Sequence, residues 1–204
     1  LLIGAFRFAA LEAVILNKAM SLVVVASALP FRAATVPLEA VAAQGAVILN
    51  LLAGSLLGAW LGAGWATRLK SESLHRVIAV LLVAIATALL LGHDAGGDRL
   101  PPFDGVLLAI AGVVAGFTIG VVAALLGVAG GELLIPTLVL LFGANLQLAG
   151  SLSLAVSLPT MIVGFARYSR DRSFAVLGQN RTFVLVMGAG SIVGSFVGGQ
   201  MLGV

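Results

Sequence analysis

Apolar residues fill long runs of this chain, and polar residues gather in the short segments between those runs. A helix that spans a membrane needs about 20 consecutive, mostly apolar residues. The pattern predicts such helices at residues 8–29, 41–66, 74–92, 104–126, 147–167 and 181–203, with a shorter helix at 133–142. The sequence therefore predicts an all-α integral membrane protein, folded as a polytopic helix bundle.

The segment GVAGGE, residues 127–132, separates the helix predicted at 104–126 from the short helix at 133–142. Clustered glycine permits non-helical backbone. Within a membrane, such backbone is tolerated only where protein buries it or water reaches it. Free amides and a positive dipole end at the start of the second helix favour an anion. This glycine-rich broken helix is therefore either a turn near the membrane interface or part of a substrate path.

Two segments of the chain resemble each other. AGSLLGAWLG at 53–62 and AGSIVGSFVG at 189–198 share Ala, Gly, Ser, Gly and Gly in register, which indicates two related repeats. Their glycines recur every four residues, so tight packing against another helix is expected, with pore lining as the alternative. We expect one transmembrane transporter domain, 1–204: the remainder of a first repeat at 1–93, a loop at 94–104, and a second repeat at 105–204 with an incomplete C-terminus. Both ends lie within apolar runs, which predicts a fragment truncated at both ends.

Basic residues gather in two of the connections, and by the positive-inside rule both connections are cytoplasmic. The first carries Arg68, Lys70 and Arg76, and the second carries Arg167, Arg170, Arg172 and Arg181. The connections that follow the helices at 8–29 and 147–167 then lie on opposite sides of the membrane. That arrangement requires the helix at 133–142 to cross most of the membrane, and it predicts inverted repeats, which are typical of secondary transporters.

The composition supports a membrane protein and excludes several other classes. The chain is 61% hydrophobic and 9% charged, whereas soluble domains carry about 25% charged residues. Cysteine is absent and the two histidines, His75 and His93, are far apart, so we expect no metal site and no cofactor. A serine nucleophile would have no base in reach, so no catalytic residue and no enzyme activity is expected. The net charge of +3 belongs to membrane-flanking loops, so nucleic-acid binding is not expected.

The first predicted helix carries Glu12, Asn17 and Lys18. A lysine near the centre of a membrane helix costs about 2.5–3.5 kcal/mol on insertion scales, so Lys18 should face a cavity or a partner. The alternative is that Lys18 snorkels to the interface. Asn17 and Lys18 together would line a site for an anion. Glu12 and Glu132 are candidates for proton coupling, since each places a carboxylate near apolar helix.

The helix predicted at 147–167 begins with hydroxyl residues and contains Pro159. Either these hydroxyls bind a ligand, or they bond to backbone and hold helices together. Of the remaining polar residues, Asn50 is expected to join helices and Arg167 to orient the chain. Pro136 fits either the first turn of the short helix or a kink within it. The hydroxyl residues are Ser151, Ser153, Ser157 and Thr160.

Residues 116–167 resemble the TauE/SafE family of sulfite exporters, through a glycine-rich break, the apolar run LLIPTLVLLFG and the helix start LAGSLSLAV. The resemblance implies a bacterial inner-membrane, multi-pass transporter of small sulfur-containing anions. Two departures bear on the substrate: the break has fewer consecutive glycines than the family often shows, and the first helix carries Glu12, Asn17 and Lys18 in place of small hydroxyls. The family pattern carries over to Gly127, Gly130, Gly131, Pro136, Ser151 and Ser153.

The expected function is secondary, alternating-access transport of a small anion such as sulfite or an organosulfonate. The alternatives are a non-transporting membrane subunit that packs through its glycine faces, and an anion channel. Expected partners are the anionic substrate, the lipid bilayer and further copies in a homo-oligomer. The candidate substrate-binding residues are Asn17, Lys18, Gly127, Gly130, Gly131, Ser151, Ser153 and Ser157.

Overall fold

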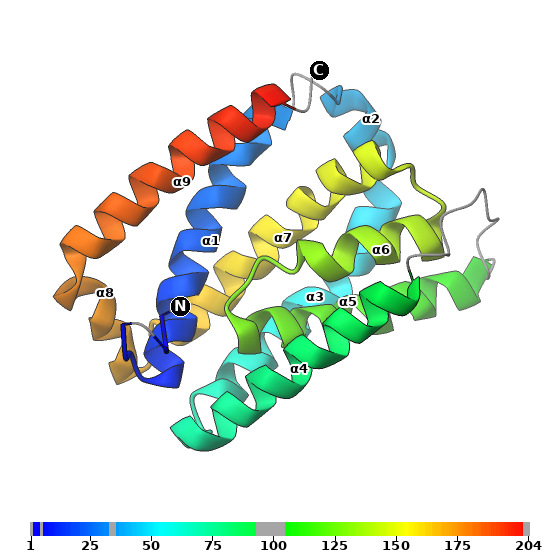
Figure 1. Cartoon of the computed structure of the whole chain (residues 1–204). Helices are drawn as coiled ribbons and strands as arrows, with labels where there is room; N and C mark the ends of the chain where they lie inside the picture. The colour runs from blue at the N-terminus through cyan, green and yellow to red at the C-terminus, as the bar shows by residue number, and fades with distance from the viewer. Residues whose placement is uncertain (1, 5, 33–35, 93–104, 202–204) are drawn as a thin grey trace.

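The computed structural model describes residues 2–4, 6–32, 36–92 and 105–201 (Figure 1), and over these residues it is all helical. Among the described residues, five helices are long and apolar enough to cross a membrane, which confirms the predicted all-α, polytopic membrane fold. Residues 93–104, which contain His93 and the predicted loop between repeats, lie outside the described residues. The helices are α1 (Ala10–Arg32), α2 (Leu38–Ala43), α3 (Gly45–Ala66), α4 (Ser71–Gly92), α5 (Gly105–Leu126), α6 (Gly131–Phe142), α7 (Leu146–Tyr168), the 3₁₀ helix η2 (Arg172–Phe174), α8 (Ala175–Gln179) and α9 (Arg181–Met201).

The prediction of a single helix at 41–66 is wrong. The structure divides it into α2 and α3 at Gln44, whose φ of −93° and ψ of 23° leave helical geometry. Apolar residues continue on both sides of Gln44, so hydropathy carries no sign of the division. The connection after α7 also holds two short helices, η2 and α8, that are too short to give a periodic signal.

Glycines bring α3 and α5 into backbone contact. A Cβ atom built on Gly54 would lie 1.9 Å from the carbonyl oxygen of Val113, and one on Gly62 would lie 2.9 Å from Val121. Between them, a Cβ on Gly58 would lie 2.1 Å from a backbone oxygen of α5. The contacts advance by four residues at a time on both helices, so α3 and α5 run in the same direction. The predicted tight packing is confirmed for α3.

The partner helix contributes glycines of its own. A Cβ on Gly116 would lie 2.3 Å from the Leu51 carbonyl oxygen, and a Cβ on Gly120 would lie 2.3 Å from that of Ser55. Glycine on each helix therefore faces backbone on the other at these five positions.

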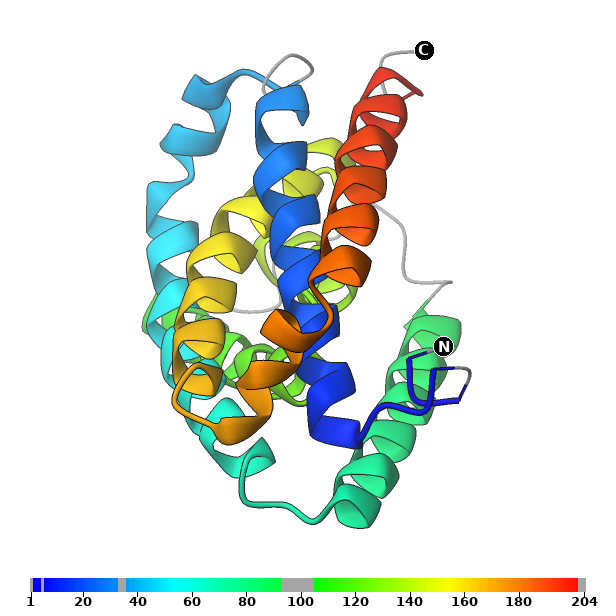
Figure 2. The same cartoon turned by 90° about the vertical axis from the view of Figure 1, so that its left-hand side faces the viewer.

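The matching glycines of α9 do not pack in this way. Nothing in the described part of the chain lies within 4 Å of a Cβ built on Gly190, Gly194 or Gly198. Instead α9 runs beside α1 (Figure 2), and a hydrogen bond of 3.0 Å joins Ser27 Oγ to Ser195 Oγ. Tight packing through these glycines is thus not found among the described residues.

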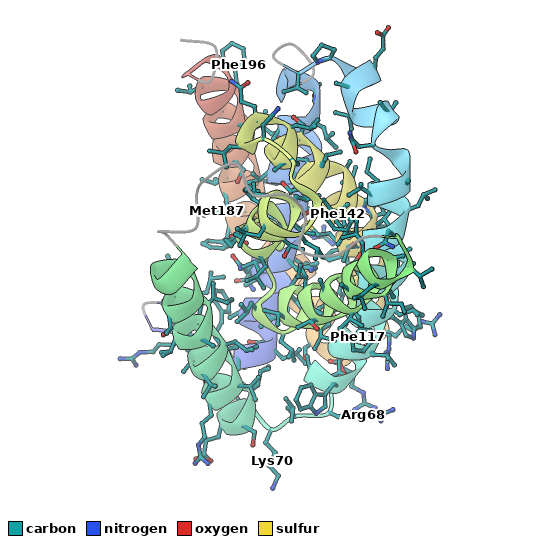
Figure 3. The ribbon with its side chains drawn as sticks, turned by 90° about the vertical axis from the view of Figure 1, so that its right-hand side faces the viewer. Arg68, Lys70, Phe117, Phe142, Met187 and Phe196 are labelled. Atoms are coloured by element: carbon teal, nitrogen blue, oxygen red, sulfur yellow. The ribbon has the colours of Figure 1, made fainter. Side chains whose placement is uncertain are left out.

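The helices α3, α5 and α7 all end on the same side of the bundle. Ser55 Oγ and Thr160 Oγ1 lie 2.7 Å apart, and the Arg167 guanidinium lies 5.6 Å from the Trp60 ring, so α3 and α7 run in parallel. Figure 3 shows Arg68 at this end and Phe196 of α9 at the opposite end. We call it the basic end, because it carries Arg68, Lys70, Arg167 and Arg170.

Both α1 and α4 begin at the basic end, since the Ala10 amide donates to Ser71 Oγ at 3.3 Å. The rings of Phe8 and Phe183 lie 6.2 Å apart, so α9 begins there as well. α3 and α9 therefore run in opposite directions, as inverted repeats require, although the relation between the repeats stays a prediction. At 1.5 Å per residue, the 12 residues of α6 reach about 18 Å, a little over half of a typical hydrocarbon core.

Candidate functional site

The break between α5 and α6 is a turn formed by two glycines with positive φ and closed by backbone hydrogen bonds. Gly127 has a φ of +69° and Gly130 a φ of +84°, a region that glycine enters without steric cost. The amide of Gly127 donates to Ala124 O and the amide of Val128 donates to Ala123 O, both at 3.1 Å. This pair of bonds is the Schellman arrangement that closes a helix C-terminus. α6 then begins directly after Gly130, with no side-chain cap.

Lys18 is the central side chain of the site. It is 0% exposed, and its Nζ donates to Ala123 O and to Val128 O, each at 3.1 Å. The ammonium thus joins the last turn of α5 to the break. Cations are stabilised at helix C-termini, where unpaired carbonyls carry partial negative charge. The alternative that Lys18 snorkels to the interface is wrong, because its charged end is buried inside the bundle.

Two further side chains bond to the same helix end. Asn17 Nδ2 donates to Leu126 O at 3.4 Å, and the Tyr168 hydroxyl donates to Ala124 O at 2.8 Å. Tyr168 is fully buried. The carbonyls that a helix C-terminus leaves unpaired are therefore met by side chains from α1 and α7 as well as by the turn itself.

The backbone of α1 packs directly against the backbone of the break. A Cβ built on Gly127 would lie 2.4 Å from Val14 O, so α1 backbone rests directly on the turn. Val14 and Lys18 lie four and eight residues after Ala10, which corresponds to about 6 and 12 Å along α1. The break therefore lies one to two helical turns inward from the start of α1 at the basic end.

The start of α6 leaves backbone donors free. Within the described residues, no hydrogen-bond acceptor meets the amides of Gly130, Gly131 or Glu132. The Glu132 side chain is exposed, and no cation within the described ranges pairs with it. Pro136 lies in the second turn of α6, which leaves a kink within the helix as the remaining one of its two alternatives.

Two cavities flank the break, and both reach α4. The larger has a volume of about 230 Å³ and includes Asn17 and Leu126 in its wall. The smaller has a volume of about 100 Å³ and is lined on one side by Val128, Gly130 and Glu132. Each is larger than a four-atom anion, so the break has space for a small ligand on either side.

The hydroxyl residues of α7 are placed differently from Lys18. Ser151 Oγ donates to Gln147 O at 3.5 Å and Ser153 Oγ donates to Gly150 O at 2.8 Å, both within α7. Ser157 Oγ is buried with no hydrogen-bond partner. The structure brings Asn17, Lys18 and the glycine break together, but no hydrogen bond among the described residues joins these serines to that group.

Other predicted residues have local roles. Glu12 Oε2 accepts the Ala9 amide at 3.2 Å, which caps the start of α1. Asn50 Nδ2 donates to Ala109 O at 2.9 Å and so joins α3 to α5 as expected. Neither carboxylate proposed for proton coupling, Glu12 or Glu132, lies within 4.0 Å of a basic group in the described chain.

Sequence reasoning missed two residues of the site, Tyr168 and Gly164. A Cβ built on Gly164 would lie 3.4 Å from Lys18 Cε, an ordinary van der Waals distance, so this glycine lies directly beside the lysine side chain. Tyr168 is the only tyrosine in the chain and stands at the end of an apolar helix. Because a buried tyrosine hydroxyl usually finds a partner, this isolated phenol was a usable signal.

A comparison with protein families places the whole chain in one group. The family profile described as Sulfite exporter TauE/SafE matches residues 1–204. The match includes the first half of the chain, where the resemblance read from the sequence is weaker. Comparisons with curated proteins and with solved structures found no match.

Proposed function

The chain belongs to the TauE/SafE sulfite exporter family, a family of membrane transporters, and on that premise we propose that it carries sulfite or an organosulfonate by secondary transport. The proposed binding site is the break between α5 and α6, together with Asn17 and Lys18. We place the protein in the inner membrane of a bacterium with its basic end in the cytoplasm.

The observation that carries the proposal is a buried cation without a carboxylate partner. Lys18 is 0% exposed, yet no Asp or Glu in the described ranges lies within 4.0 Å of its Nζ. The only ion pair found among those residues joins Arg76 to Glu72 on the surface of α4. A buried charge is costly unless it is paired, and an intramembrane lysine is a functional candidate. An anion entering the break would supply the missing partner.

The groups around Lys18 suit an oxyanion. An ammonium has three N–H donors, and carbonyls of the described chain accept two of them. The third donor and the free amides of Gly130 and Gly131 are available to negatively charged oxygen atoms. Donors near a helix N-terminus bind anions through both hydrogen bonds and the helix dipole. Sulfite and the sulfonate group both present oxygen atoms to such donors.

The break has a mechanical role in this transport as well. Lys18 holds Ala123 O and Val128 O on either side of the turn. An anion that binds the ammonium competes with the two carbonyl oxygens and weakens both hydrogen bonds. α6 then becomes free to shift relative to α5. Alternating access needs such a coupling between occupancy of the site and helix position.

The test is sulfite flux into proteoliposomes that contain the full-length protein. Lys18→Met should abolish flux, because Met keeps the apolar stem and removes the charge and its donors. Lys70→Met is the matched control, since Lys70 is the only other lysine in the chain and is exposed in the connection before α4. Lys70→Met should leave flux unchanged.

The break also depends on Lys18, so each variant is first checked for folding by circular dichroism and size-exclusion chromatography. Wild-type flux in folded Lys18→Met protein would refute the proposed site. Rates that do not saturate with sulfite would instead indicate a channel. Absence of flux for a panel of sulfur-containing anions with the wild-type protein would favour the non-transporting subunit.

A further inference from the structure

A separate cavity lies at the basic end, between the last turns of α3 and α7. It has a volume of about 200 Å³. The Arg167 and Arg170 guanidinium carbons lie 5.6 and 5.1 Å from the centre of the Trp60 ring, within the range of cation–π attraction. We call this cavity the Arg–Trp pocket. Its lining residues are Trp60, Leu61, Gly64, Trp65, Arg68 and Arg167.

The Arg167 side chain packs against α3 at Gly64, where α3 has no side chain of its own. A Cβ built on Gly64 would lie 3.2 Å from Arg167 Nε and 3.3 Å from Nη2, closer than ordinary van der Waals contact. The guanidinium therefore rests on the backbone at Gly64 and faces the ring of Trp60. This packing fixes the orientation of the planar Arg167 guanidinium, whose N–H donors match the geometry of phosphate.

The pocket carries positive charge that the described chain does not neutralise. Within the described ranges, Arg68, Arg167 and Arg170 have no carboxylate within 4.0 Å. Asp171 follows directly in sequence, but its Oδ1 accepts the amide of Ser173 and so caps η2. Three guanidiniums thus converge near one cavity without an acidic partner.

The surface beside the pocket is apolar and faces outward from the bundle. Trp65 is 49% exposed and Leu61 is 58% exposed, and Leu57 one turn earlier is 63% exposed. Tryptophan concentrates at the membrane–water interface, where its ring meets both apolar chains and headgroups. Toward the membrane centre the surface is therefore suited to an acyl chain, and toward the basic end it is suited to an anion.

We infer that the Arg–Trp pocket binds the phosphate headgroup of an anionic phospholipid, whose acyl chain lies along Leu57 and Leu61. Basic pockets between membrane helices on the cytoplasmic side recognise anionic lipid headgroups through this combination of charge and apolar surface. The site shares no lining residue with the two cavities at the break, and it does not depend on which anion is transported.

The experiment is native mass spectrometry of the full-length protein, delipidated in detergent and titrated with phosphatidylglycerol. Phosphatidylcholine, which has the same phosphate but no net charge, and inorganic phosphate are the comparison probes. The variants are Arg68→Gln, Arg167→Gln and the double variant. Arg181→Gln is the matched control, since Arg181 is exposed at the start of α9 near the same end but does not line the pocket.

We expect phosphatidylglycerol to bind more tightly than phosphatidylcholine, and each pocket variant to weaken its binding about fivefold, with about 25-fold for the double variant. Arg181→Gln should bind as wild type does. Equal binding of the two lipids, or an equal loss in Arg181→Gln, would overturn the assignment. Displacement of phosphatidylglycerol by equimolar inorganic phosphate would also overturn it, since the site would then recognise free phosphate. Arg68 is exposed, so Arg68→Gln keeps the test valid if the double variant fails to fold.

Discussion

Alanine at Gly58 and at Gly194 should have opposite effects on stability, although the two positions match in the repeated segments. A Cβ on Gly58 would lie 2.1 Å from Phe117 O, whereas a Cβ on Gly194 meets nothing in the described chain within 4 Å. To restore an ordinary contact of 3.4 Å, α3 and α5 would have to separate by about 3.4 − 2.1 = 1.3 Å. A gap of 0.5–1 Å already forfeits about a quarter to a half of each dispersion contact.

From these distances we expect Gly58→Ala to lower the free energy of unfolding by about 1–3 kcal/mol, the usual cost of overpacking. Gly62→Ala should cost less, because its nearest contact is 2.9 Å. Gly194→Ala should raise the free energy of unfolding by about 0.5–1 kcal/mol, the usual gain over glycine within a helix.

The assay is reversible unfolding in mixed micelles, in which dodecyl sulfate is increased while tryptophan fluorescence is recorded. Both tryptophans of the chain, Trp60 and Trp65, lie on α3, so the signal reports directly on the helix that is perturbed. Equal effects of Gly58→Ala and Gly194→Ala would contradict the packing described for α3 and α9. A Gly58→Ala protein as stable as wild type would refute it as well, because the backbone seam would then tolerate a methyl group.

Three more predictions concern the break, besides the loss of flux expected for Lys18→Met. Tyr168→Phe should lower the free energy of unfolding by about 1–3 kcal/mol, since the buried Ala124 carbonyl loses its hydroxyl partner; an unchanged unfolding curve would contradict this role. Gly127→Ala should destabilise by more than about 1 kcal/mol, because its φ of +69° and its 2.4 Å approach to Val14 O both disfavour a side chain; the same micelle titration measures it. Glu132→Gln should flatten the pH dependence of sulfite flux if its carboxylate couples a proton, and a superimposable pH profile would remove Glu132 from that role.

Long apolar runs predicted all five helices that are long and apolar enough to span a membrane among the described residues, because such a run is both the signal and the physical cause of insertion. The sixth predicted span, 74–92, forms α4, which is not among these five. The sequence did not predict the division at Gln44, since one residue with non-helical dihedrals leaves the apolar pattern unchanged. Nor did the repeated glycine motif predict packing by itself. The motif is the same in α3 and α9, but only in α3 do its glycines face a described helix, α5, whose glycines Gly116 and Gly120 also recur every four residues.

For the candidate site, the sequence indicated that Lys18 needs a partner and that the glycine cluster forms a turn. It did not indicate that the partners would be backbone carbonyls, because every residue carries one and none is marked in the sequence. Ser153 and Ser157 lie four residues apart, so the sequence places both on one face of α7. Spacing gives a shared helix face but not the neighbour that the face meets, and no hydrogen bond in the described chain joins these residues to Lys18.

The bond from Lys18 to Ala123 spans 105 positions in the sequence, and this separation has a consequence for biosynthesis. At about 5–20 residues per second, α1 is complete about 5–20 s before the end of α5 is made. During that interval the lysine has neither its carbonyl partners nor their shelter from lipid. Stable insertion of α1 into the bilayer therefore depends on the later synthesis of α5, which belongs to the second half of the chain. When α1 is expressed alone, it should insert less efficiently than α1 followed by α5.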